Sequence, residues 1–288
     1  SVPRLDPFTP SSTNGLFSSL VCSDFYVPKI PGIEENRPSL LLQGLDTLDQ
    51  EVTKIKPSYK YIDGIKGGKG GPGSLYGTSG AGKTRSVLEY LSHNYGIYIA
   101  VKKDPYLPAE PDPGSGETRN LFRHLARADS GAASDANIEK VATGLKVLIL
   151  CRHIVLKALQ GRFGAENFNP YHWLLLQLYP QHFFGDIDIF HELLKMYQLQ
   201  LPKDIDELYL YTKFEWISAI VVDESQVLLR DNSQYFRSQN EPEKFRSSFL
   251  GVFKALLQVR HDSRKKCVPF AVFSGTGMSM NGFDKERN

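Results

Sequence analysis

The sequence predicts an α/β fold built on a parallel sheet. The segments between its short apolar runs carry helical periodicity, and strands that alternate with helices are typical of parallel sheets. The run at 216–222 is the strongest, and it is apolar on both faces, as a central parallel strand must be. The segments that we expect to form strands are Ser74–Tyr76, Gly96–Val101, Trp216–Val222 and Val268–Phe273.

Composition places the chain among globular proteins and limits its partners. It has 288 residues, of which 41% are hydrophobic and 23% charged, with a net charge of +2. A net charge this small produces no long-range positive field that would attract nucleic acid, so a nucleic-acid contact would need a local patch of positive charge. No apolar stretch approaches the roughly 20 residues that span a bilayer, so we expect no membrane association. The cysteines at 22, 151 and 267 form no CxxC pair, which favours an intracellular, reducing compartment.

The amino-terminal part divides into an arm and the start of the main domain. Prolines interrupt residues 1–38 without any sustained period, which predicts an extended arm. Residues 39–56 have apolar positions at helical spacing, and we expect the domain to run over 39–288. The glycine-rich stretch at 63–73 contains a literal GxGxxG, but no strand precedes it, so a flexible loop is the better interpretation.

The central third predicts a helical insertion at about 117–212, between the second and third strands. Its helices are expected at 119–128, 135–160, 170–178 and 188–199, with Ser134 as the N-cap of the second. The insertion could form a lid or a surface for a protein partner. One more helix is expected at 242–260, before the last strand.

Between the first strand and its helix lies a match to GxxxxGK[ST], the pattern of a phosphate-binding P-loop. Glycines let successive N–H groups converge on phosphates, and the helix beginning near Lys83 points its positive end at the same anion. Lys83 is expected to reach the β- and γ-phosphates, and the Thr84 hydroxyl to bind Mg²⁺. The expected nucleotide contacts are Gly77, Thr78, Ser79, Gly80, Ala81, Gly82, Lys83, Thr84 and Arg85.

The third strand ends in two acids, the form of a Walker B segment. Asp223 is expected to hold the Mg²⁺ shell, and Glu224 to orient or deprotonate the attacking water. A buried strand followed by an acidic helix cap is the alternative interpretation. No NKxD-type guanine-reading motif follows, which favours ATP over GTP.

A polar tip ends the fourth strand, which we expect to lie between the P-loop strand and the Walker B strand. Ser274 and Thr276 are candidates to sense the γ-phosphate from there. The same Ser-Gly-Thr-Gly sequence could instead be the turn that leaves the strand, and the residues favour neither interpretation.

These motifs together resemble the NTPase domain of Crinkler-type effectors and related expanded P-loop NTPase families of fungi. The resemblance rests on Tyr76–Arg85, Leu88–Leu91, Gly96–Ile99, Val221–Gln226 and Phe273–Met278. It implies an ATPase of the additional-strand, catalytic-glutamate division, often followed by a nuclease-like or kinase-like effector domain. It also implies secretion and action in the cytoplasm or nucleus of a host cell, although no secretion signal is visible in this sequence.

We therefore expect Mg²⁺-dependent binding and hydrolysis of a nucleoside triphosphate, most simply ATP. A nucleotide-gated interaction module that hydrolyses slowly is an alternative from another class, and a small-molecule phosphotransferase is a second. Oligomerisation stays open. Only fifteen residues follow Phe273, too few for a fifth strand, which favours a module cut from a longer protein.

Overall fold

A computed structural model describes residues 45, 62, 73–78, 80–101, 131–164, 166–184, 187–199, 205, 208–209, 212, 214, 216–230, 233–236, 249–260 and 269–276. The expected arm at 1–38, the glycine-rich loop at 63–72 and the helix at 119–128 lie outside them. So do the start of the helix expected at 242–260 and, apart from the buried Leu45, the helix expected at 39–56.

The sheet is parallel throughout, with the strand order β1-β4-β3-β2. β4 therefore lies between β1 and β3, as the sequence predicts. The strands are β1 Gly73–Gly77, β2 Gly96–Ala100, β3 Ala219–Asp223 and β4 Phe270–Thr276. The helices are α3 Lys83–His93, α5 Gly131–Phe163, α6 Pro170–Leu178, α7 Pro180–Phe183, α8 Ile189–Leu199, α10 Gln226–Arg230 and α11 Phe249–Arg260, with a 3-10 turn η2 at Ser233–Tyr235.

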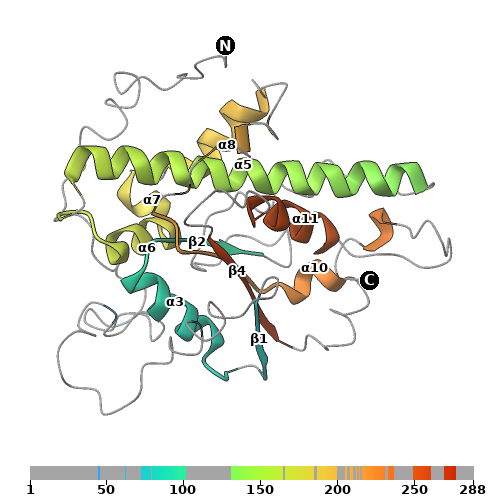
Figure 1. Ribbon diagram of the computed structural model, residues 1–288, viewed down its shortest axis with the longest axis horizontal. Helices are drawn as coiled ribbons and strands as arrows, with labels where there is room; N and C mark the ends of the chain where they lie inside the picture. The colour runs from blue at the N-terminus through green and yellow to red at the C-terminus, as the bar shows by residue number, and fades with distance from the viewer. Residues whose placement is uncertain are drawn as a thin grey trace.

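Helices pack on both faces of this sheet. Tyr90 of α3 meets Phe270 of β4 edge to face, with ring centroids 5.6 Å apart. Phe249 of α11 lies against Phe273, with centroids 4.7 Å apart. Because side chains alternate along a strand, Phe270 and Phe273 belong to opposite faces, so α3 and α11 lie on opposite sides. Figure 1 shows this arrangement, with α5 crossing the molecule beside α11.

All the described elements between β2 and β3 are helices, as expected for the insertion. The longest, α5, packs tightly on α11 at Gly251, where a Cβ would lie 2.8 Å from the Ile138 carbonyl oxygen of α5. Only glycine fits such an approach. The expected bounds of α6 are confirmed, and Asp188 precedes α8, where its Oδ1 accepts from the backbone N–H of Phe190 and of His191 at 3.1 Å.

Three sequence expectations need correction. Ser134 is not an N-cap: α5 begins at Gly131, and Ser134 is a buried residue inside it. Ala132 and Ala133 are strong helix formers, so the residues just before Ser134 do not require the helix to start there. β3 begins at Ala219 rather than Trp216, whose side chain is 43% exposed. β4 continues to Thr276, because its last residues pair with β1 through Gly77.

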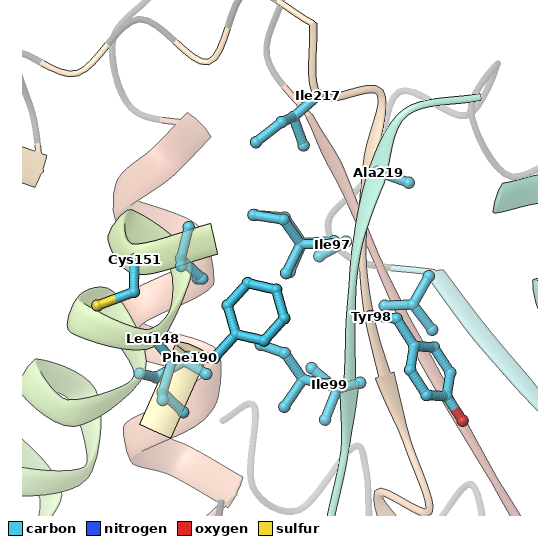
Figure 2. Packing of buried hydrophobic residues seen from close by; sticks show 14 of the residues in the cluster. Ile97, Tyr98, Ile99, Leu148, Cys151, Phe190, Ile217 and Ala219 are labelled. Carbon is cyan, nitrogen blue, oxygen red and sulfur yellow. The ribbon is translucent and has the colours of Figure 1, made fainter. Parts of the chain in front are cut away.

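The core is continuous across the sheet and the insertion. Figure 2 shows Ile97 and Ile99 of β2 pointing towards Phe190 of α8 and towards Leu148 and Cys151 of α5. Tyr98 points to the opposite side of the strand. In the part of the chain that is described, no helix is both long and apolar enough to cross a membrane.

Candidate functional site

The loop between β1 and α3 has the backbone that its glycines predict. Gly80 and Gly82 adopt φ of 77° and 78°, a left-handed conformation that favours glycine. Gly82 is the N-cap of α3 and supplies no side-chain acceptor, and the first turn of α3 contains no acidic residue. The first N–H groups of the helix thus have no capping side chain, and no acidic residue of the helix itself neutralises the positive end of its dipole.

Lys83, the first residue of α3, folds back over this loop. Its ammonium donates to the carbonyl oxygens of Gly77 at 3.1 Å and Thr78 at 2.7 Å. The side chain is only partly buried. A phosphate oxygen carries negative charge whereas a carbonyl oxygen is neutral, so Coulomb attraction would favour exchange of these two carbonyl oxygens for an anion.

Thr84 and Asp223 meet although they lie 139 positions apart in the sequence. The Thr84 hydroxyl donates to Asp223 Oδ2 at 3.0 Å. The carboxylate, at the end of β3, belongs to a residue that is 3% exposed. These two oxygens are hard ligands of the type that Mg²⁺ prefers. The structure therefore brings the two predicted metal ligands together.

Two further groups bind the same carboxylate. Tyr98 of β2 donates its hydroxyl to Asp223 Oδ2 at 2.9 Å, and the backbone N–H of Glu224 donates to Oδ1 at 3.0 Å. Sequence reasoning missed Tyr98, because it lies in an apolar run whose two faces look alike. Its hydroxyl was the available signal, since a buried tyrosine O–H usually needs a hydrogen-bond partner.

Strand register explains why Tyr98, Asp223 and Ser274 share one face. Tyr98 pairs with Val221, and Val221 with Val272. Aligned residues of parallel strands point to the same side, and so do residues two apart on one strand. The three side chains therefore lie on the face that α3 covers, beside the loop.

Glu224 has an unusual backbone for a residue with a side chain. Its φ of 56° is the only positive value at a non-glycine residue in the described ranges. The side chain is exposed, and its Oε2 accepts from the Gln226 amide of α10. A Cβ at Gly275 would collide with that same Gln226 side chain, so the amide lies against the end of β4. Sequence reasoning assigned no role to Gln226, although the residue ends the Val221–Gln226 segment on which the family resemblance rests.

Ser274 lies within β4, not in a turn, so the alternative interpretation of this segment does not hold for it. The residue is fully buried, and its Oγ has no hydrogen-bond partner within the described residues. Its carbonyl oxygen accepts from the N–H of Ser225 at 2.9 Å and from the Ser225 hydroxyl at 2.7 Å, which ties β4 to the end of β3. The backbone of Thr276 ends β4, whereas its side chain lies outside the description.

The remaining predicted contacts are spread along the loop. Thr78, Gly80, Ala81 and Gly82 are exposed, and Gly77 is half-buried at the end of β1. Ser79 lies outside the described residues. Arg85 turns along α3, where its Nε pairs with Glu89 at 3.0 Å, so a nucleotide contact from Arg85 would have to compete with that ion pair.

Side chains of α6 complete the outer edge of β2. Gln177 accepts from the Tyr98 N–H at 2.9 Å and donates to the Gly96 carbonyl oxygen at 3.0 Å. The indole N–H of Trp173 donates to the same carbonyl oxygen at 2.7 Å. The insertion therefore holds the strand that carries Tyr98.

The residues present fit a magnesium–phosphate site better than an all-protein metal site. Asp223 and Thr84 supply two oxygens, and no three His, Cys, Asp or Glu side chains gather as metal ligands among the described residues. Mg²⁺ commonly takes one or two protein oxygens and completes its shell with phosphates and water.

Comparisons with protein-family models, curated proteins and solved structures give no match.

Proposed function

We propose that this chain is a Mg²⁺-dependent P-loop nucleoside triphosphatase, with ATP as its substrate. The observation that carries the proposal is the 3.0 Å contact between Thr84 and Asp223. It unites an oxygen at the start of α3 with a carboxylate at the end of β3, beside a loop with left-handed glycines. The sequence resemblance to the NTPase domain of Crinkler-type effectors favours the same proposal.

In this proposal the loop holds the phosphates. Its backbone N–H groups and the start of α3 face the anion, and Lys83 exchanges the carbonyl oxygens of Gly77 and Thr78 for phosphate oxygens. Thr84 and Asp223 would hold Mg²⁺, which supplies positive charge to the phosphate oxygens when it is bound. Ser274 has a buried hydroxyl on the face of the sheet that α3 covers, where it can sense the terminal phosphate.

Hydrolysis transfers the γ-phosphoryl group to water. The water oxygen attacks the γ-phosphorus in line, the bond from that phosphorus to the bridging oxygen breaks, and ADP leaves. Glu224 takes the proton of the attacking water. Because Gln226 engages only Oε2 among the contacts described, Oε1 of Glu224 can serve as the base.

Binding and turnover are tested with separate variants. Lys83→Ala should weaken ATP binding in isothermal titration calorimetry by about tenfold or more, because a charge-assisted contact is worth roughly 1.5–3 kcal/mol. Lys195→Ala is the matched control, since Lys195 pairs with Glu192 on the exposed face of α8. Equal ATP affinity of wild type and Lys83→Ala contradicts the binding site.

Steady-state phosphate release then distinguishes the function classes. The wild type should release phosphate, and Glu224→Gln should bind ATP but release phosphate at least about a hundredfold more slowly, the usual loss of a general base. Binding without release by the wild type would favour a nucleotide-gated module instead. Transfer of label from γ-labelled ATP to a small molecule would favour a phosphotransferase.

A further inference from the structure

The Asp223 carboxylate is held by three donors from three parts of the chain. Oδ2 accepts from Thr84 at 3.0 Å and from Tyr98 at 2.9 Å, and Oδ1 accepts from the N–H of Glu224 at 3.0 Å. A carboxylate offers about four acceptor positions, and these three donors leave about one of them for a metal ion. That position faces the metal ion only if the carboxylate keeps one orientation. The donors that fix this orientation therefore decide whether the free lone pair faces the metal.

Tyr98 is the donor with the most rigid support. Its residue is 3% exposed, its strand pairs with β3, and its N–H is held by Gln177. Thr84, by contrast, is itself a predicted metal ligand, and the Glu224 N–H belongs to a residue with a strained backbone. Among the three donors, only the tyrosine hydroxyl comes from a side chain that neither binds the ion nor takes part in the chemistry.

We propose that Tyr98 is a positioning residue for Mg²⁺: its hydroxyl fixes the Asp223 carboxylate in the orientation that binds the ion. This inference rests on the proposed function, because it assigns Asp223 to the metal. Removal of a residue that orients a metal ligand without itself contacting the metal commonly lowers metal affinity by about 10- to 100-fold. Through Gln177, the helical insertion supports the metal site as well.

The test uses Mn²⁺ as a spectroscopic substitute for Mg²⁺. The 288-residue wild type and its Tyr98→Phe variant are saturated with ADP, and Mn²⁺ binding is titrated by electron paramagnetic resonance. Tyr98→Phe should bind Mn²⁺ about tenfold or more weakly, whereas ADP affinity in EDTA should equal that of the wild type. Any smaller loss of Mn²⁺ affinity, or a gain, overturns the inference.

Tyr209→Phe is the matched control for a lost tyrosine hydroxyl. Tyr209 is also buried, but its hydroxyl donates to the Ala255 carbonyl oxygen at 3.4 Å, in α11. It should leave Mn²⁺ affinity unchanged. Thermal unfolding checks that each variant is folded, and Tyr98→Met provides a second hydroxyl-free variant with apolar bulk. If the wild type binds neither ADP nor Mn²⁺, the proposed function fails; if the wild type binds both and Tyr98→Phe equals it, only this inference fails.

Discussion

Replacement of Gln177 by leucine should destabilise the protein by about 1.5–4.5 kcal/mol. Leucine has a similar shape but removes both hydrogen bonds to β2. The Tyr98 N–H would be left buried without its acceptor, at a cost of about 1–3 kcal/mol. The Gly96 carbonyl oxygen keeps the indole N–H of Trp173, so this second loss should cost only about 0.5–1.5 kcal/mol.

Urea unfolding of wild type and Gln177→Leu measures this difference, and amide hydrogen exchange locates it. The Tyr98 amide should exchange faster in the variant. Leu174→Met is the control, because it changes a buried side chain of the same helix and should cost less than about 1.5 kcal/mol. A loss below about 1 kcal/mol in Gln177→Leu, or unchanged exchange at Tyr98, would refute the argument that α6 supports the strand through this amide.

Two other predictions concern protonation and catalysis. Burial, with a smaller contribution from the charge of Lys157, lowers the pKa of His153 from 6.5 to about 4. Between these values the unfolded chain binds more protons, so stability should fall as the pH falls, by about 2 kcal/mol at pH 5 relative to pH 7. His153→Leu should remove that part of the pH dependence in urea unfolding; parallel profiles for the two proteins would contradict it. Gln226→Leu should lower kcat for phosphate release by about tenfold with unchanged ATP affinity, because Glu224 loses its amide partner. An unchanged kcat would exclude Gln226 from positioning Glu224.

Local sequence patterns predicted the elements around the loop well. The alternation of apolar runs and helical periods predicted four parallel strands, and the expectation that β4 lies between β1 and β3 is confirmed, whereas the place of β2 beside β3 was not predicted. The meeting of Thr84 and Asp223 was also predictable although the two residues lie 139 positions apart in the sequence. The carboxyl ends of all strands in a parallel sheet share one edge, so polar residues that follow β1 and β3 are carried to the same side of the sheet.

Features that depend on tertiary packing could not be predicted in the same way. In the sequence, Gln177 interrupts an apolar stretch and gives no sign that its amide bonds to a strand eighty residues earlier. Tyr98 looks like one more apolar strand residue until the register shows which face it occupies. Ser134 failed as an N-cap because a serine caps a helix only where the residues before it are not helical, and here Gly131–Ala133 already belong to α5.

The amide of Gln177 also has a consequence for how this sheet can grow. A strand at the border of a sheet normally exposes unpaired N–H and C=O groups, which recruit extra strands or promote aggregation. At β2 those groups on Gly96 and Tyr98 are already bonded to side chains of α6. These bonds oppose the addition of a strand along Gly96–Tyr98, whereas among the described strands β1 pairs only with β4, so the border beside β1 lacks a comparable cover within the described part of the chain.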